Sequence, residues 1–125
     1  MTTKLISVGF FLHLLFCYNV SVQAQCIADA GSDRIICAED LNDGVKIGGN
    51  PTATGGTAPY SYRWYSKLTI DGVHFPASGA LNDTTLANPS LKSVLGWYHL
   101  EVTDANPLTC YDSVGIGISY FEIDL

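Results

Sequence analysis

The sequence predicts an all-β fold, an antiparallel sandwich of about seven strands. No helical stretch of useful length appears after residue 24. Short runs rich in Val, Ile, Tyr and Trp recur instead, and Gly, Pro, Asn and Asp bound them, which is typical of a β-sandwich. The strands are expected at residues 27–30, 34–37, 44–48, 59–66, 68–75, 84–87, 96–104 and 111–121.

Three of these runs have strict period-two alternation, so their buried faces can be assigned. Burying each large apolar side chain gains roughly 1.5–3 kcal/mol, and the apolar sets are therefore expected to form the core, with Trp64 at its centre. The predicted core sets are Tyr60, Tyr62 and Trp64 in the first run, Tyr98, Leu100 and Val102 in the second, and Val114, Ile116, Ile118 and Tyr120 in the third.

The first 24 residues have the pattern of a secretory signal peptide. Lys4 supplies the positive start, residues 5–20 are apolar, and small residues precede a cleavage site after Ala24. The apolar run is short for a membrane span, which needs about 20 apolar residues, although an uncleaved anchor remains the alternative. We therefore expect a signal peptide at 1–24 and a single exported domain at 25–125.

The chain is acidic, with 6 Lys and Arg against 12 Asp and Glu and a formal net charge of −6. Nucleic-acid binding needs a basic face, so this balance argues against that class of partner. The charge suits an exported protein or one that binds cations. No later hydrophobic run is long enough to span a bilayer, so no transmembrane span is expected in the mature chain.

Three cysteines, Cys26, Cys37 and Cys110, remain once Cys17 leaves with the signal peptide. An exported chain enters an oxidising compartment, and an odd number allows at most one intramolecular bridge with one thiol left over. A metal site built on cysteine or histidine is not indicated, because there is no Cys-x-x-Cys and because His74 and His99 lie apart in the sequence.

The segment "GGNPTATGGTAPYSYRW", residues 48–64, could be a ligand-binding loop or a turn that leads into a strand. A phosphate-binding loop would open a helix and end in Lys and Ser or Thr. This segment runs instead into a β-rich sequence, and its glycines and prolines suit backbone turns. We therefore predict a turn between strands.

The segments "DAGSDRIIC" (29–37), "VKIGGNPTATGGTAPYSYRW" (45–64), "LANPS" (86–90) and "YHLEVTDANPLTCYDSVGI" (98–116) together resemble the PKD-like (polycystic-kidney-disease-repeat-like) domain. This module occurs in bacterial secreted and surface proteins, notably those exported by type IX secretion. The resemblance implies an Ig-like β-sandwich with a non-enzymatic role in adhesion, in protein or carbohydrate contact, or in spacing. Two alternatives are an accessory substrate-binding domain of a secreted hydrolase and a purely structural spacer.

The resemblance also implies a disulfide between Cys37 and Cys110, which would leave Cys26 as a free or intermolecular thiol. It implies either a monomer or a module of a larger protein. The sequence departs from the better-known PKD repeats in one respect. "RWYSKLTIDG" replaces their acidic stretch, which weakens the case for the calcium site that such a stretch would form.

Residues that could bind calcium or catalyse a reaction are sparse. Four aspartates flank the predicted turns and could supply oxygen ligands to calcium, or form only a solvated acidic rim. No nucleophile elbow, metal-binding helix motif or paired histidines appear, so we predict that the protein is not an enzyme. No other cofactor is expected. The four aspartates are Asp29, Asp33, Asp104 and Asp112.

A possible contact patch emerges if strands 59–66 and 96–104 are neighbours. Alternation then turns one set of aromatic and charged side chains outward together, and recognition surfaces favour aromatics with Arg. The alternative is ordinary cross-strand pairing of large residues. A surface protein or a polysaccharide would be the partner of such a patch. Its residues are Arg63, Tyr65, Trp97, His99 and Glu101.

Overall fold

The structure, a computed structural model, describes residues 24–70, 73–94 and 96–120. Within these residues seven strands form two sheets, and the helical content is limited to two short 3-10 turns, η1 (Ala38–Asp43) and η2 (Ala77–Gly79). The prediction of an all-β sandwich is therefore confirmed. Residues 1–23 of the expected signal peptide lie outside the described residues. The described residues contain no helix that is long and apolar enough to cross a membrane.

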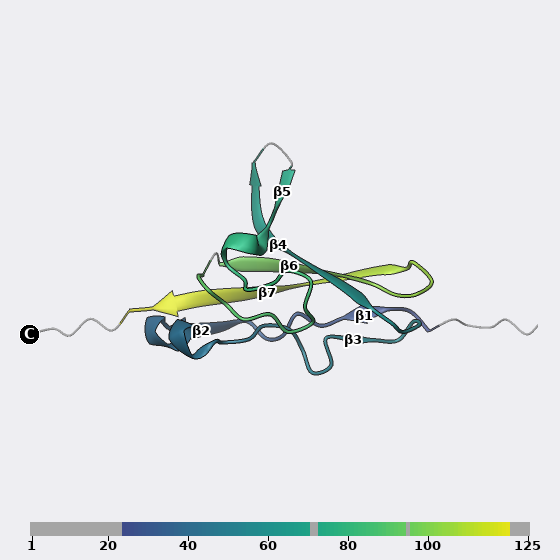
Figure 1. Cartoon of the computed structure of the whole chain (residues 1–125), viewed down its shortest axis with the longest axis horizontal. Coiled ribbons are helices and arrows are strands. Elements are labelled where there is room, and N and C mark those ends of the chain that lie inside the picture. The colour runs from purple at the N-terminus through teal and green to yellow at the C-terminus, as the bar shows by residue number, and fades with distance from the viewer. Residues whose placement is uncertain (1–23, 71–72, 95, 121–125) are drawn as a thin grey trace, which may run out of the picture.

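The larger sheet has five strands in the order β2-β7-β6-β4-β5 (Figure 1). β6 lies in its middle and pairs antiparallel with β4 on one side and β7 on the other, while β2 joins the far edge of β7 in parallel. The strands are β2 (Arg34–Cys37), β4 (Ser61–Ile70), β5 (Val73–Pro76), β6 (Trp97–Thr103) and β7 (Thr109–Ser119).

The second layer is less regular. β1 (Ile27–Ala28) pairs antiparallel with β3 (Ala53–Thr54), and the layer continues through two isolated bridges, Lys46↔Ser90 and Leu81↔Leu91. The strand predicted at 44–48 is thus reduced to a single bridge. The segment predicted as a strand at 84–87 does not form one. In Figure 1, β1 and β3 lie below β6 and β7 of the larger sheet.

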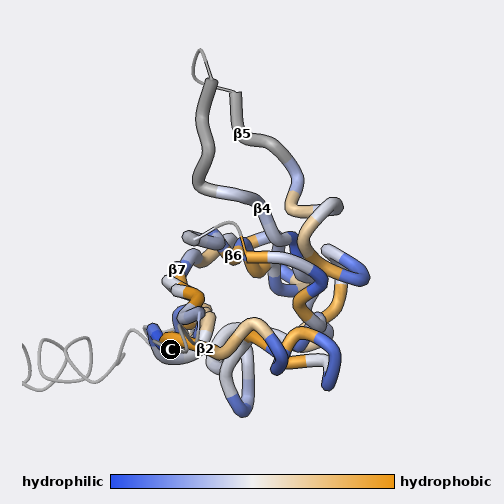
Figure 2. Tube along the Cα trace, turned by 90° about the vertical axis from the view of Figure 1, so that its left-hand side faces the viewer, coloured by the Kyte–Doolittle hydropathy of each residue, from blue (hydrophilic) through white to orange (hydrophobic). Residues whose placement is uncertain are grey.

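β4 and β5 form a hairpin that extends away from the sandwich (Figures 1 and 2). The sequence predicted separate strands at 59–66 and 68–75, whereas β4 continues to Ile70 and the register shifts between Tyr65 and Thr69. Residues 71, 72 and 121 of the predicted strands lie outside the described residues. The Gly-rich segment before β4 consists of turns and bends apart from β3, so the turn prediction is confirmed there.

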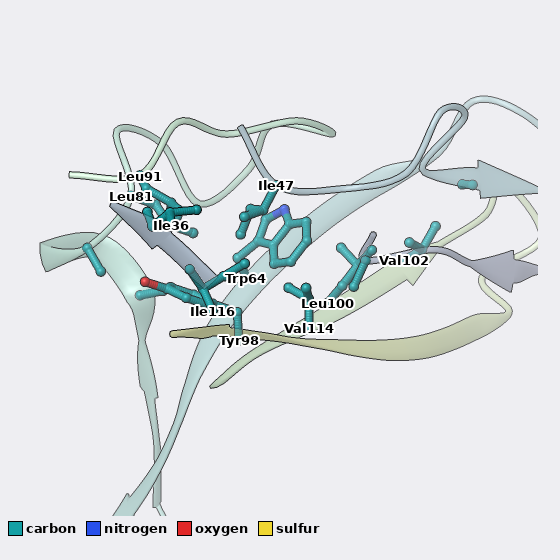
Figure 3. Close-up of a cluster of buried hydrophobic side chains, with 14 of the residues drawn as sticks. Ile36, Ile47, Trp64, Leu81, Leu91, Tyr98, Leu100, Val102, Val114 and Ile116 are labelled. Atoms are coloured by element: carbon teal, nitrogen blue, oxygen red, sulfur yellow. The ribbon is translucent and has the colours of Figure 1, made fainter. Parts of the chain in front are cut away.

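Trp64 lies at the centre of the core, with 1% of its surface exposed (Figure 3). Its indole Nε1–H donates to the Leu86 carbonyl oxygen at 2.9 Å, so its polar atom is satisfied inside the sandwich. The predicted burial of the alternating residues in β6 and β7 is confirmed for Tyr98, Leu100, Val102, Val114 and Ile116.

The prediction for Tyr120 is wrong, because 75% of its surface is exposed. The last paired residues of the β2–β7 ladder are Cys37 and Ser119, so Tyr120 lies beyond the end of the pairing. Tyr60 and Tyr62 are half-buried and pack against the edge of the core. Alternation therefore identifies the inner face but not where the pairing stops.

The disulfide joins Cys26 to Cys110, and Cys37 is an exposed free cysteine, so the pairing of Cys37 with Cys110 is wrong. The parallel pairing of β2 with β7 explains the difference. It places Cys37 beside Ser119 at the end of β7, whereas Cys110 lies near the start of that strand. About nine residues of extended strand separate the two positions, which is about 30 Å. Cys26 instead precedes β1, which contacts β7.

Candidate functional site

The outer face of the larger sheet is the face of β4, β6 and β7 turned away from the core. Successive strand residues point to opposite faces, so the neighbours of the buried residues lie on this side. The register aligns them in two rows, Tyr65–His99–Ser113 and Arg63–Glu101–Tyr111. We define the outer face by the residues Arg63, Tyr65, Trp97, His99, Glu101, Tyr111, Ser113 and Gly115. All five residues of the predicted contact patch are in this set.

The Arg63 side chain contacts two neighbours on the outer face, Glu101 and Tyr65. Its Nη1 atom lies 4.0 Å from Glu101 Oε1, and its guanidinium carbon lies 5.4 Å from the centroid of the Tyr65 ring. The Arg63 side chain is 67% exposed, so the ion pair contributes little to stability. Its effect is to orient the guanidinium beside an aromatic ring and a carboxylate.

A hollow of about 500 Å³ lies in the middle of the outer face. Tyr65 and Tyr111 come from the strands on either side of β6, and His99 and Glu101 come from β6 between them. His99 Nδ1 and Ser113 Oγ are hydrogen-bonded at 2.6 Å across the β6–β7 pair. The hollow thus combines two phenol rings with an imidazole and a carboxylate.

Sequence reasoning missed Tyr111 and Ser113. Both were expected within a strand at 111–121, and period-two alternation from Gly115 backwards places both on the outward side. The signal was therefore present in the strand but was not extended to its beginning. Tyr111 is 68% exposed, so its ring is available on the outer face.

Trp97 lies across the neighbouring strand, over Gly115. A Cβ atom built on Gly115 would lie 3.2, 3.2 and 3.3 Å from Cη2, Cζ2 and Cε2 of the Trp97 ring. Asp33 is hydrogen-bonded to the same glycine: its Oδ1 accepts from the Gly115 N–H at 2.8 Å. A second hollow, of about 480 Å³, surrounds this group and is lined by Asp33, Arg34, Ile35, Gly96, Trp97, Gly115, Ile116 and Gly117.

The structure does not gather the four aspartates predicted as calcium ligands into one group. Within the described parts of the chain there is no group of three or more His, Cys, Asp or Glu residues that could hold a metal ion. Each aspartate instead accepts a hydrogen bond from a backbone N–H, which fixes its carboxylate locally. The donors are Gly31 to Asp29, Gly115 to Asp33, Ala30 to Asp112, and Thr57, Asn106 and Leu108 to Asp104.

Asp104 is the most heavily hydrogen-bonded of the four and is buried at the end of β6. Its Oδ1 accepts from Leu108 and Asn106 at 2.9 Å, and its Oδ2 accepts from Thr57 at 3.0 Å. The Leu108 hydrogen bond, followed by that of Thr57, holds the pKa of Asp104 below its ordinary value, against the opposing effect of burial. This carboxylate therefore organises two turns.

The two-layer all-β topology is that of a PKD/Ig-like domain, which confirms the resemblance seen in the sequence. The chain is similar to the solution structure of the PKD domain from KIAA 1837 protein, with 20% sequence identity, a TM-score of 0.56, and coverage of 82% of this chain and 91% of that chain. It is also similar to the Ig-like domain of human Leucine-rich repeat-containing protein 4, at 18% identity, a TM-score of 0.41, and coverage of 77% and 88%. No protein-family model and no curated protein matches the sequence.

At 20% identity the first of these likenesses shows the fold alone. It says nothing about which partner the outer face contacts, so that question depends on the side chains of this chain.

Proposed function

We propose that the protein is a non-enzymatic extracellular module that contacts a surface protein or a polysaccharide through the outer face of its larger sheet. The hollow between Tyr65 and Tyr111 is the main support for this proposal. It places two aromatic rings beside an imidazole and a carboxylate on a face that does not contribute to the core. Binding surfaces are enriched in Tyr, Trp and Arg, and exposed aromatic clusters often mark them.

An extracellular location is part of the proposal. Disulfides form and persist in oxidising compartments, and the bond between Cys26 and Cys110 is consistent with such a location. The signal-peptide pattern at residues 1–24 supports export, with residues 25–125 as the mature domain.

The test is a double variant, Tyr65→Ser with Tyr111→Ser. Removing both rings should lower binding to intact bacterial cells and to immobilised polysaccharides by tenfold or more, because aromatic anchors carry much of the energy of a contact. Bound protein is measured against concentration by sedimentation with the cells or the polysaccharide.

Leu86→Ser is the matched control, because Leu86 is 43% exposed and lies outside the outer face. It should bind like the parent chain. Equal binding by the double variant and the parent would overturn the proposal, and so would a parent that binds neither cells nor polysaccharide, which would favour a spacer.

A further inference from the structure

We propose that the Trp97 ring is a platform on which a sugar ring stacks, so that the partner is a polysaccharide rather than a protein. This inference rests on the proposed function and adds the chemical class of the ligand. It depends on the second hollow, around Trp97, Gly115 and Asp33, rather than on the hollow between the two tyrosines.

The distances show that the indole lies flat on the sheet. Three consecutive ring atoms are almost equidistant from the Cβ position of Gly115, at 3.2–3.3 Å. A ring that met this point with its edge would have one atom much nearer than the other two, so the ring presents its face. Trp97 is 44% exposed. One face of the ring covers Gly115, and nearly half of the residue remains accessible to solvent.

Glycine makes this arrangement possible. A real Cβ at residue 115 would make a tighter contact than is usual, so the indole would have to move by a few tenths of an ångström. Gly117, two residues further along the same face, lets Ile35 approach in the same way, with its Cγ1 at 3.3 Å from the Cβ position. The two glycines thus form a shallow depression between a flat ring and an exposed aliphatic side chain.

Asp33 supplies a polar group beside the platform. Its Oδ1 is fixed by the Gly115 N–H, and the carboxylate has a second oxygen with lone pairs to accept further hydrogen bonds. A pyranose ring has C–H groups on its faces and hydroxyls around its edge. It would stack its apolar face on Trp97 while an edge hydroxyl donates to Asp33.

Two features favour a sugar over a protein partner. Protein contacts concentrate their energy in anchors that are buried in closed, well-packed pockets, whereas this hollow is shallow and presents a flat ring. The hollow is also lined by one acidic and one basic residue, Asp33 and Arg34, so it offers no excess charge to attract an ionic partner. A neutral ligand with both apolar and hydroxyl surface complements such a site.

The experiment uses the difference in solvent exposure between the two tryptophans. Trp64 is 1% exposed and Trp97 is 44% exposed, so quenching of fluorescence by iodide reports mainly on Trp97. Cellulose, chitin, xylan and starch serve as pull-down probes for the purified full chain, and soluble oligosaccharides of each serve in the fluorescence titration. We expect binding to at least one of the four, with protection of Trp97 from iodide.

Three variants test the residues involved. Trp97→Ala should reduce binding at least tenfold, and Trp97→Phe should retain part of it because a smaller ring remains. Gly115→Ala keeps the indole but displaces it slightly from the sheet and should weaken binding less than Trp97→Ala does. Leu108→Ser, at 44% exposure outside this face, should bind like the parent. Circular dichroism and the thermal midpoint establish that each variant is folded.

The outcomes separate this inference from the proposed function. If the parent binds none of the four polysaccharides, or if folded Trp97→Ala binds as the parent does, stacking on Trp97 is overturned. Loss of cell binding in the Tyr65 and Tyr111 double variant, without any polysaccharide binding by the parent, would retain the contact face and assign it to a protein partner.

Discussion

At the scale of single residues, Asp104 shows how a carboxylate that resembles a ligand in the sequence serves the fold. The turn after β6 and the loop before β4 each leave backbone N–H groups without strand partners. Asp104 accepts hydrogen bonds from three of them, at Leu108, Asn106 and Thr57. Buried donors without partners are costly, so this one side chain stabilises both turns.

Asp104→Asn should lower stability at neutral pH and alter its dependence on pH. The folded pKa of Asp104 lies below the ordinary value of 3.8, so its contribution is present above the unfolded pKa and is lost as the pH falls through the folded pKa. Urea unfolding of both proteins between pH 7 and pH 2.5 measures the difference, which should shrink as the solution becomes acidic. A constant difference over this range would contradict the assignment.

Single residues also show what the sequence could reveal. Alternation in β6 correctly identified Tyr98, Leu100 and Val102 as buried, because a paired strand has a strict period of two. The same rule failed at Tyr120, since no local pattern states where pairing ends. The flat placement of Trp97 on Gly115 was also beyond the sequence, because it depends on the cross-strand register.

At the scale of elements, the direction of β2 decides the chemistry of the cysteines. An antiparallel β2 over the same stretch of β7 would place Cys37 opposite Ile116, nearer to Cys110 than it is in the observed pairing. The observed parallel pairing carries Cys37 to the other end and leaves Cys110 for Cys26. Strand direction depends on the whole topology, which explains why three cysteines in a sequence do not determine their own pairing.

Peptide mapping without reduction should find Cys26 linked to Cys110, and iodoacetamide should modify Cys37 in the folded protein. Cys26→Ser should lower the free energy of unfolding by about 4.5 kcal/mol, from the chain entropy of a bond with a sequence separation of 84. Cys37→Ser should change it little, because Cys37 is exposed and lies outside the disulfide. A mapped link that includes Cys37 would contradict the structure.

At the scale of the whole molecule, the sequence predicted the layers better than the irregular connections between them. β2, β6 and most of β7 coincide with predicted strands because long apolar alternation and β-branched residues mark them. The second layer is held mainly by bridges and loop hydrogen bonds, such as Leu91 N–H to the Val45 carbonyl oxygen, which leave no periodic signal.

Export predicts a defined mature protein. Cleavage after Ala24 should leave Gln25 as the first residue when the full reading frame is expressed in an exporting bacterial host. Intact mass and N-terminal sequencing of the exported material measure the site. A secreted or surface-bound chain that retains residues 1–24 would favour the uncleaved anchor.

The disulfide also determines how the domain would carry tension. The described chain begins and ends at opposite ends of the long axis (Figure 1). A pull applied at residues 24 and 120 passes through Cys26, crosses the covalent bond to Cys110 and follows β7 outward. Residues 27–109, which hold most of the core and most of the outer face, lie outside this path.

In a single-molecule pulling experiment the oxidised domain should therefore not release that loop. The reduced domain should lengthen by an additional 28–30 nm or so, at about 3.3–3.6 Å for each of the 84 residues. The outer-face residues of β4 and β6 would thus be shielded from the load by the disulfide, whereas Tyr111, Ser113 and Gly115 on β7 would lie in its path.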